Sequence, residues 1–168
     1  MAHMHVNSAA LNIRATPDMQ SDNVLVALPF GYPVLTTGEA SPHPWVSIVT
    51  IWNGKTFSGF VNFGYLREPL SDATESLLAV AAMAWTNKDK NYALPNLDSG
   101  FESQSIALAR PDIGDVICTG HNDLVVAKGM TQVWALSGDL KLTRYPLLED
   151  GHLDDRSGNV VAVMRNLV

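Results

Sequence analysis

The side chains of this sequence with the clearest chemical potential lie in the segment 114–129, which contains His121 and the only cysteine, Cys118. Gly, Asn and Asp residues there interrupt two runs of β-branched residues. This pattern predicts two short strands, 116–118 and 124–127, joined by a tight turn. His121 then lies at the mouth of a strand, where an imidazole faces a cleft rather than the core. Cys118 lies within the first strand, where a cysteine is usually a small buried hydrophobic residue.

Other kinds of site find less support in the residue spacing. Oxygen and nitrogen ligands for zinc or calcium occur in two places, but they match no known ligand spacing. These residues are His121, Asp123, His152, Asp154 and Asp155. The chain also has no phosphate-binding glycine loop, no Gly-x-Ser-x-Gly motif and no dinucleotide fingerprint. We therefore predict no metal and no cofactor.

Composition limits the class of protein and its partners. The 168 residues suffice for one ordinary domain or two small ones, and 46% hydrophobic residues suffice for a packed core. The net charge of -6 argues against a nucleic-acid partner, because phosphate binding requires a basic surface. The longest apolar run, 77–85, is too short to span a bilayer, so we predict no membrane span.

The cysteine content and the N-terminus leave the compartment open. A single cysteine permits no internal disulfide, and it fits both a reducing compartment and a secreted bacterial protein without disulfides. Residues 1–4, Met-Ala-His-Met, look like a remnant of an expression tag, and no signal peptide follows them. We expect a native leader to have been removed.

Residues 6–68 read as an all-β module. Short strands alternate with turns rich in Gly, Pro and Asn, which is typical of a small barrel or sandwich. Asn53-Gly54 is a strong hairpin signal, because both residues tolerate a positive φ. The predicted strands are 11–14, 24–28, 34–37, 45–49 and 56–62, and the run ends at Gly64-Tyr65-Leu66.

The order of these motifs resembles a bacterial SH3 (SH3b) domain over residues 6–66. The matching motifs are Leu-Asn-Ile-Arg (11–14), Phe-Gly-Tyr-Pro-Val (30–34), Trp-Val-Ser-Ile (45–48), Asn-Gly-Lys-Thr-Phe-Ser-Gly-Phe-Val (53–61) and Tyr-Leu (65–66). One departure is Phe60, where the family often has Trp. The resemblance implies a small SH3-like β-barrel. Because SH3b domains commonly target cell-wall hydrolases to their substrate, it also implies binding to peptidoglycan peptides or cross-bridges.

Aromatic and amide side chains suit a peptide or glycan ligand, because they combine flat apolar faces with hydrogen bonds. The candidate ligand-binding residues are Asn12, Arg14, Tyr32, Trp45, Trp52 and Tyr65. Period-two alternation places Leu11 and Ile13 inward, so Asn12 and Arg14 should point outward. By the same alternation Trp45 is expected in the core. Trp52, beside the hairpin turn, is the better candidate for an exposed aromatic.

The second region, 69–168, begins with a helix. Pro69 excludes a continued strand, and Asp72 followed by Glu75 has the spacing of a capping box, with Asp72 as N-cap. We expect the helix to end near Asn87. Its apolar stripe, which we assign to the core, is Leu77, Ala81, Ala84 and Trp85.

The remainder of this region reads as a loop followed by strands. Pro95, Gly100 and Pro111 interrupt the polar segment 87–111, in which a short helical turn is expected near 103–109. After the strands around His121 come predicted strands 131–136 and 140–144, an acidic loop 146–158 and a last strand 159–166. The predicted fold class is therefore mainly β, with one helix packed on an antiparallel sheet in an α+β second domain.

Residues 73–168 resemble, in separate pieces, the NlpC/P60-type (papain-like) peptidases. The resemblance is strongest to an uncharacterised hydrolase-like branch of that superfamily. The matching pieces are a helix ending in Trp (81–85), a Pro-x-x-Gly-Asp strand with Cys (111–118), His-x-Asp (121–123), Val-Trp-Ala-Leu-Ser-Gly-Asp (133–139) and Arg-Tyr-Pro-Leu-x-x-x-Gly-x-Leu (144–153). The resemblance implies that His121 is the catalytic histidine and that Ser137 or Asp139 orients it.

The chain departs from that family at the nucleophile. A papain-like enzyme has its cysteine at a helix N-terminus, where the dipole and the imidazole lower the thiol pKa. Here the only cysteine is Cys118, in a strand, and the nucleophile-bearing helix is missing between Trp85 and Phe101. Ser76, in the first helical turn, lacks an identified base. We therefore expect a truncated, non-catalytic domain, with Cys118, His121 and Asp139 as the residues of any remaining activity.

Three hypotheses follow from these resemblances. The first is a protein that binds peptidoglycan or its stem or cross-bridge peptides, in the periplasm or secreted to the cell wall, with a cytoplasmic location still open. The second is a peptidoglycan peptidase or amidase that uses His121. The third is a protein-binding inhibitor or immunity-type partner.

Overall fold

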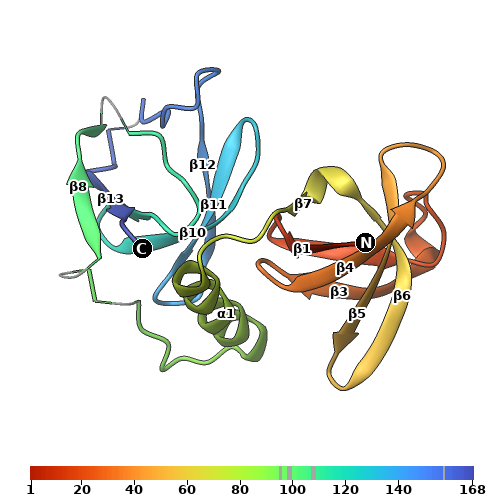
Figure 1. The fold of residues 1–168 in the computed structure, drawn as a ribbon. Coiled ribbons are helices and arrows are strands. Elements are labelled where there is room, and N and C mark those ends of the chain that lie inside the picture. Colours follow the sequence, from red (N-terminus) through yellow and green to blue (C-terminus); the bar gives the residue numbers. More distant parts are fainter. Residues whose placement is uncertain (95, 98–99, 107–108, 157) are drawn as a thin grey trace. The chain divides into compact units, whose positions relative to one another are not determined.

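The computed structural model describes residues 1–94, 96–97, 100–106, 109–156 and 158–168. The chain divides into two compact units, Met1–Leu70 and Ser71–Val168. The described residues are mainly β-strand, with one α-helix in the second unit (Figure 1). This confirms the predicted mainly-β class and the single helix. None of the described helices is both long enough and apolar enough to cross a membrane.

The first unit is one curled antiparallel sheet with the strand order β3-β2-β6-β5-β4-β1-β7 (Figure 1). Its elements are β1 (Ala2–Val6), β2 (Ala10–Arg14), the 3-10 turn η1 (Ser21–Asn23), β3 (Val24–Pro29), β4 (Pro33–Glu39), β5 (Trp45–Trp52), β6 (Lys55–Asn62), the 3-10 turn η2 (Phe63–Tyr65) and β7 (Leu66–Arg67). The predicted strands 11–14, 24–28, 34–37, 45–49 and 56–62 are present as β2 to β6, each one to three residues longer than expected, whereas residues 64 and 65 lie in the turn η2 and Leu66 begins β7.

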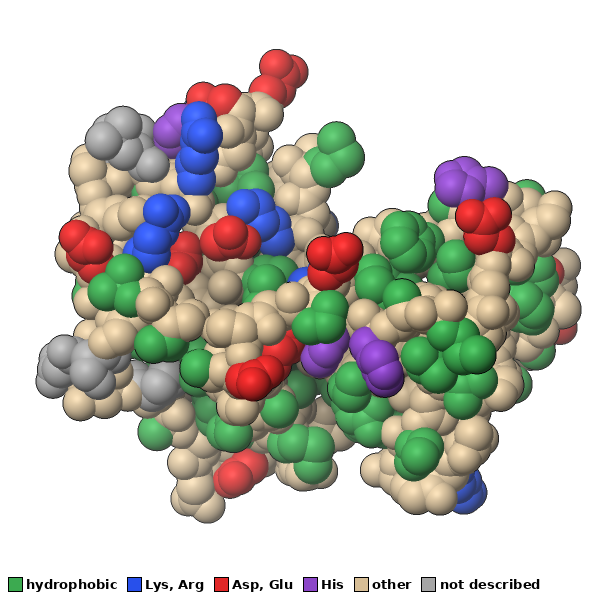
Figure 2. All heavy atoms as spheres, in the orientation of Figure 1, with side chains coloured by type: hydrophobic (Ala, Val, Ile, Leu, Met, Phe, Trp, Pro, Cys, Tyr) green, Lys and Arg blue, Asp and Glu red, His purple; other side chains and the backbone are tan. Residues whose placement is uncertain are grey.

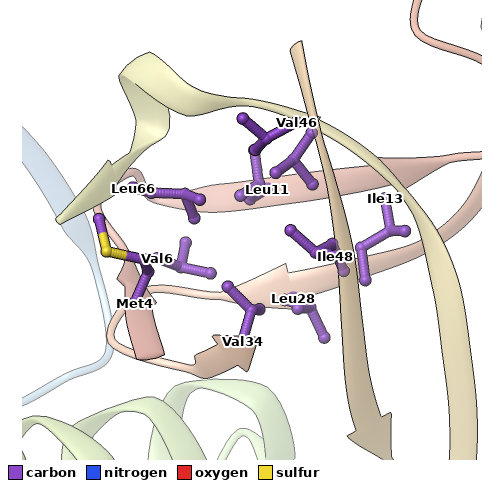
Figure 3. Packing of buried hydrophobic residues seen from close by; sticks show 10 residues of the cluster. Met4, Val6, Leu11, Ile13, Leu28, Val34, Val46, Ile48 and Leu66 are labelled. Atoms are coloured by element: carbon purple, nitrogen blue, oxygen red, sulfur yellow. The ribbon is translucent and has the colours of Figure 1, made fainter. Parts of the chain in front are cut away.

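The curled sheet encloses an apolar cluster. Its side chains come from all seven strands, β1 to β7, and point toward one another (Figure 3). The buried members are Met4, Val6, Leu11, Ile13, Leu28, Val34, Val46, Ile48, Val61 and Leu66. Alternation along each strand brings these residues to the inner face, and burial of their apolar surface stabilises the sheet.

The Asn53-Gly54 hairpin is as predicted. Asn53 has φ 49° and Gly54 has φ 74°, which are the two positive values that a type I′ turn requires. The turn sets the register in which Trp52 pairs with Lys55 and Trp45 with Asn62. Asn53 and Gly54 therefore determine the turn type and the register of the long β5–β6 hairpin.

Strand β1, which begins within the Met-Ala-His-Met segment, was not predicted from the sequence. Ala2–Val6 lies between β4 and β7 in the sheet, and Met4 and Val6 are buried in the core. His3, which precedes Met4 and lies on the other face of the strand, is exposed, and His5, between Met4 and Val6, is half-buried. The sequence pattern missed this strand because its partners are about 30 and 60 residues away, so non-local pairing stabilises it rather than local propensity.

The second unit contains one helix and a six-stranded antiparallel sheet of order β12-β11-β10-β9-β13-β8 (Figure 1). Its elements are α1 (Asp72–Asn87), β8 (Phe101–Gln104), β9 (Val116–Cys118), β10 (Asn122–Lys128), β11 (Gln132–Ser137), β12 (Leu142–Pro146) and β13 (Ala162–Asn166). One face of this sheet carries the buried cluster Ala109, Ile117, Val125, Val133, Ala135, Leu153, Val160 and Val163. A helix followed by an antiparallel sheet is the predicted arrangement.

Three local predictions in this unit need correction. The N-cap of α1 is Ser71, whose hydroxyl accepts a hydrogen bond from the Thr74 N–H at 3.3 Å, and not Asp72. The extended conformation required of an N-cap is adopted one residue earlier than the acidic spacing suggested. The buried residues of the helix are Thr74, Leu78, Ala81, Ala82 and Ala84, so Leu78 replaces Leu77 in the core stripe, and Trp85 is half-buried.

The segment 87–111 also differs from its prediction. Ser103 and Gln104, which were expected in a helical turn, lie in β8 and pair with Met164 and Val163 of β13. Residues 107–108 of the predicted turn lie outside the described residues, as does Pro95, which was expected to interrupt the segment. Pairing with the last strand of the chain is again a non-local effect that a local polar pattern does not reveal.

Gly114 and Asp115 anchor the start of β9 to the C-terminal strand. Gly114 has φ 93°, and a Cβ atom there would lie 2.7 Å from Nδ2 of Asn166 and 3.0 Å from Cγ2 of Thr74. The Asp115 carboxylate is buried and accepts hydrogen bonds from the N–H groups of Asn166, at 2.9 Å, and Asp112, at 2.8 Å. Burial raises the pKa of Asp115. The Gly-Asp pair therefore has a structural role, in which it fixes the strand that leads to Cys118.

Candidate functional site

The second unit has an open cavity of about 730 Å³ at the turn between β9 and β10. Its wall is formed by that turn, by β12 with the residue before it, and by the loop between β12 and β13. The lining residues are Thr119, Gly120, His121, Lys141, Thr143, Arg144, Tyr145, Pro146, Leu153, Asp154, Asp155, Arg156, Asn159 and Val160. The structure thus places His121 on the wall of a cavity, at the start of the strand where it was expected.

Backbone and hydroxyl hydrogen bonds hold the turn that carries His121. The Thr119 N–H donates to the His121 carbonyl oxygen at 2.8 Å, and the Thr119 hydroxyl donates to the same oxygen at 3.1 Å. The side chain of His121 is 63% exposed. The imidazole is therefore accessible from the cavity, while its backbone is fixed.

Asp123 lies directly behind His121. Its side chain is fully buried, and its Oδ1 atom is 3.3 Å from Nε2 of His121. The Tyr145 hydroxyl donates a 2.5 Å hydrogen bond to Oδ2 of Asp123. Oδ1 has no well-oriented hydrogen bond among the described residues, and the 3.3 Å contact with the imidazole is the ion pair that the structure gives it. Burial raises the pKa of Asp123, and the bond from Tyr145 opposes this shift.

This arrangement can orient an imidazole for proton transfer. A buried carboxyl group next to one ring nitrogen fixes the orientation of the ring, which leaves the other nitrogen for a substrate or a water molecule. From the sequence, Asp123 was expected as a possible metal ligand and as part of the His-x-Asp motif, and not as the residue that orients His121. The signal for its actual position was the period-two spacing of His121 and Asp123, which places both on one face of a strand.

Asp139, the expected orienting residue, has a different partner. Its Oδ1 accepts a short hydrogen bond from the Ser137 hydroxyl, and this bond is the largest influence that lowers the pKa of Asp139. The Ser137 hydroxyl also accepts from the Lys141 N–H at 3.1 Å. Among the described interactions none joins Asp139 to His121 by a hydrogen bond. Ser137 and Asp139 therefore close the turn between β11 and β12.

The environment of Cys118 opposes nucleophilic chemistry. The thiol is half-buried in β9, whose backbone pairs with β10 on one side and β13 on the other. Burial raises its pKa, and the negative charge of Asp123 raises it further. A thiolate nucleophile requires the opposite shift. Ser76 is exposed on α1.

The possible metal ligands are divided among separate pairs. Nδ1 of His152 lies 2.8 Å from Oδ2 of Asp150, and the Arg156 guanidinium binds the Asp154 carboxylate at 2.6 Å. In the part of the chain that the structure describes, no group of three or more His, Cys, Asp and Glu side chains could hold a metal ion.

The first unit has a smaller cavity, of about 190 Å³, between β2, β5 and the turn before β7. It is lined by Ser8, Ala10, Leu11, Asn12, Arg14, Met19, Trp45, Asn62 and Tyr65. Four of the six candidate ligand-binding residues, Asn12, Arg14, Trp45 and Tyr65, are therefore brought to one place. Asn62 is a lining residue that the sequence analysis did not select.

The four residues differ in exposure. Asn12 points outward as predicted, and Tyr65 is 49% exposed. Trp45 is buried, in agreement with its predicted core position, and forms part of the cavity wall. Arg14 is only 7% exposed, which corrects the prediction that it points outward. A β-bulge between Ile13 and Arg14 breaks the alternation and turns the guanidinium inward.

Tyr32 and Trp52 are not part of this cavity. Their rings make an edge-to-face contact with centroids 4.9 Å apart, and the Tyr32 hydroxyl donates to the Ile51 carbonyl oxygen at 2.6 Å. Both pack half-buried against the core of the first unit. Trp52 is therefore not the exposed aromatic that its place beside the hairpin turn suggested, because Tyr32 covers one edge of it.

Charge is mixed over the second unit. Figure 2 shows Lys and Arg side chains lying among Asp and Glu side chains on the face that it draws. The larger cavity has the same character, since Lys141, Arg144 and Arg156 line it together with Asp154 and Asp155.

No protein-family model matches this chain, and no curated protein matches it.

Proposed function

We propose that this protein binds peptides of the bacterial cell wall, and that the 190 Å³ cavity of the first unit is the binding site. One observation carries the proposal: Asn12, Arg14, Trp45 and Tyr65, from β2, β5 and the turn before β7, line a single cavity. An aromatic wall next to amide and guanidinium donors is suited to a peptide.

The resemblance to SH3b domains supports the same reading. It implies that the curled sheet of the first unit is an SH3-like barrel and that its ligand is peptidoglycan or one of its stem or cross-bridge peptides. In this proposal the protein acts in the periplasm or outside the cell. The second unit is a hydrolase-like domain without a working thiol, since the raised pKa of Cys118 disfavours the thiolate.

Sedimentation with purified sacculi tests the proposal. Tyr65→Ala removes a cavity residue that is 49% exposed, and Phe63→Ala removes a 46% exposed aromatic that does not line the cavity. We expect the wild-type protein and Phe63→Ala to sediment with the sacculi and Tyr65→Ala to stay in solution. Sedimentation of all three proteins would show that the cavity is not the binding site. If the wild-type protein stays in solution, the cell-wall proposal fails and a protein partner, such as the target of an inhibitor, becomes the leading candidate.

A second candidate function, amide or peptide hydrolysis, is favoured by the contact of His121 with the buried Asp123. In this reading the imidazole removes a proton from water, because Cys118 is unsuited to attack the substrate. Mass spectrometry of muropeptides after incubation with the protein tests it. New fragments that disappear in His121→Ala and in Asp123→Asn, but persist in Asp139→Asn, would identify the base and its orienting residue. An unchanged muropeptide pattern would exclude this candidate.

A further inference from the structure

Arg14 is a buried cation that forms no ion pair with a carboxylate of the described residues. Its side chain is 7% exposed, and its hydrogen bonds come from Nη1, to the Gln20 carbonyl oxygen at 2.5 Å and to Oδ1 of Asn23 at 2.8 Å. Among the residues that the structure describes, no ion pair includes Arg14. Buried charges are normally paired, because removing an ion from water costs several kcal/mol.

The charge of Arg14 acts on the Asp18 carboxylate, but the two form no ion pair. Oδ1 of Asp18 accepts hydrogen bonds from the Gln20 N–H at 3.0 Å and from Nδ2 of Asn23 at 2.6 Å. The bond from Gln20 is the largest influence that lowers the pKa of Asp18, and the charge of Arg14 is a minor one. Asp18 therefore organises the loop that holds Arg14 rather than pairing with it.

The cavity beside Arg14 is rich in donors that lack partners. Nε and Nη2 of Arg14 and Nε1 of Trp45 have no hydrogen-bond partner among the described residues. Asn62 uses its Oδ1 to accept from the Gly64 N–H at 2.9 Å, so its amide Nδ2 remains available. All three residues line the cavity. Arginine and tryptophan side chains can only donate, so the ligand group that fits them is one that only accepts.

We propose that this cavity binds a carboxylate group, namely the free C-terminal carboxylate of a short peptide, through Arg14, Trp45 and Asn62. The apolar lining residues Ala10, Leu11 and Met19 provide room for a small apolar side chain next to the carboxylate. A volume of about 190 Å³ lies below the roughly 300–1,000 Å³ of sites that enclose a drug-sized ligand, so the cavity holds the end of a chain. This inference rests on the proposed function for the statement that the ligand is a peptide.

A carboxylate fits better than a phosphate. Among the described lining residues Arg14 is the single Lys or Arg, which matches a monoanion. The chain as a whole carries a net charge of -6, which repels more highly charged anions.

The test compares two ligands that differ only in the end group. N-acetyl-alanyl-alanine is titrated into the full-length ¹⁵N-labelled protein as the free acid and as the carboxamide, each with L- and with D-residues. We expect the acid to shift the Trp45 Nε1–H and Arg14 Nε–H signals and to bind at least about 10-fold more tightly than the amide, because bonds to a charged acceptor are stronger. Inorganic phosphate serves as a third ligand and should leave these signals in place.

Two variants locate the effect. Arg14→Gln removes the proposed partner and should abolish the difference between acid and amide, whereas Lys55→Gln removes an exposed cation at the β5–β6 turn and should preserve it. If Arg14→Gln does not fold, Arg14→Lys is used in its place, because lysine keeps the positive charge. Equal binding of acid and amide, no binding of either, or an equal response to phosphate would overturn the proposal.

The same titration separates this inference from the proposed function. Sedimentation with sacculi together with equal affinity for acid and amide would leave cell-wall binding intact and refute the carboxylate site. Binding of the free acid by a protein that ignores sacculi would support the carboxylate site and direct the search to peptides of another origin.

Discussion

Oδ1 of the fully buried Asp123 lies 3.3 Å from Nε2 of His121, whose own side chain is 63% exposed. The pair therefore joins the interior of the second unit to a cavity of about 730 Å³. Tyr145 completes the arrangement from the neighbouring side, because its hydroxyl donates to the other oxygen of Asp123. A buried acid held in this way has consequences for stability and titration that do not depend on the function of the protein.

The first prediction compares two tyrosine hydroxyls. Tyr145→Phe removes a hydrogen bond to a buried carboxylate and should lower the free energy of unfolding by about 1–3 kcal/mol. The Tyr92 hydroxyl is buried and has no hydrogen-bond partner among the described residues, and burial raises the pKa of Tyr92 to about 12. Tyr92→Phe should therefore leave stability unchanged or raise it. Urea unfolding of both variants measures the difference, and an equal loss in both would contradict the role assigned to Tyr145.

The second prediction concerns the titration of two aspartates. The Asp123 carboxyl should titrate above its ordinary pKa of 3.8 because it is buried, and Asp139 should titrate below 3.8 because Ser137 donates to it. Side-chain ¹³C NMR resolves the two titrations. The reverse order would show that Asp123 is hydrated in solution.

The raised pKa of Asp123 also has a consequence for stability. The native state binds the proton of Asp123 at a higher pH than the unfolded state does, so this group costs stability above its folded pKa. That cost decreases as the pH falls through the folded pKa toward 3.8. Relative to Asp123→Asn, the wild-type protein should therefore become more stable as the pH falls from about 7 to about 4, limits that follow from the carboxyl reference values. Urea unfolding of both proteins measures this difference.

The third prediction tests the anchor before β9. Gly114→Ala introduces a Cβ atom 2.7 Å from Nδ2 of Asn166 at a residue with φ 93°. The strain of a non-glycine residue there should cost about 1–3 kcal/mol. Gly138→Ala is the matched control, because a Cβ atom there meets no atom within 4 Å. Thermal unfolding should separate the two variants by several degrees, and similar melting temperatures would show that the loop rearranges without cost.

The fourth prediction tests the contribution of β1. Met4 is 7% exposed in the core of the first unit, so Met4→Ala should destabilise that unit by about 2–5 kcal/mol. His3→Ala changes the exposed neighbour in the same strand and should have an effect within about 0.5 kcal/mol. Urea unfolding followed by a probe in the first unit makes the comparison. An unchanged midpoint for Met4→Ala would mean that β1 is not part of the folded sheet in solution.

Local sequence features were sufficient for much of the fold. The alternation of apolar residues predicted β2 to β6, and Asn53-Gly54 predicted the β5–β6 turn, because a type I′ turn needs two residues that accept a positive φ. Glycine and Asn/Asp punctuation likewise predicted β9 and β10 with His121 at their junction. These features are encoded within a few residues, so a single sequence reveals them.

Tertiary structure decided the features that depend on distant segments. β1 and β8 form because β4, β7 and β13 supply their hydrogen bonds, and neither strand has a strong pattern of its own. The bulge after Ile13 turned Arg14 from an exposed position to a buried one. In each case the deciding interaction joins residues that are far apart in the chain, or changes an alternation that the sequence shows as regular.

The candidate sites divide in the same way. His121 could be selected from its residue type and its position at a strand start, whereas its pairing with Asp123 rather than Asp139 depended on which carboxylate is buried behind the ring. Asn12, Arg14, Trp45 and Tyr65 could be named individually from the sequence. Their convergence on one cavity, with the buried guanidinium of Arg14 in its wall, required the curled sheet, because only the sheet brings β2, β5 and the turn before β7 together.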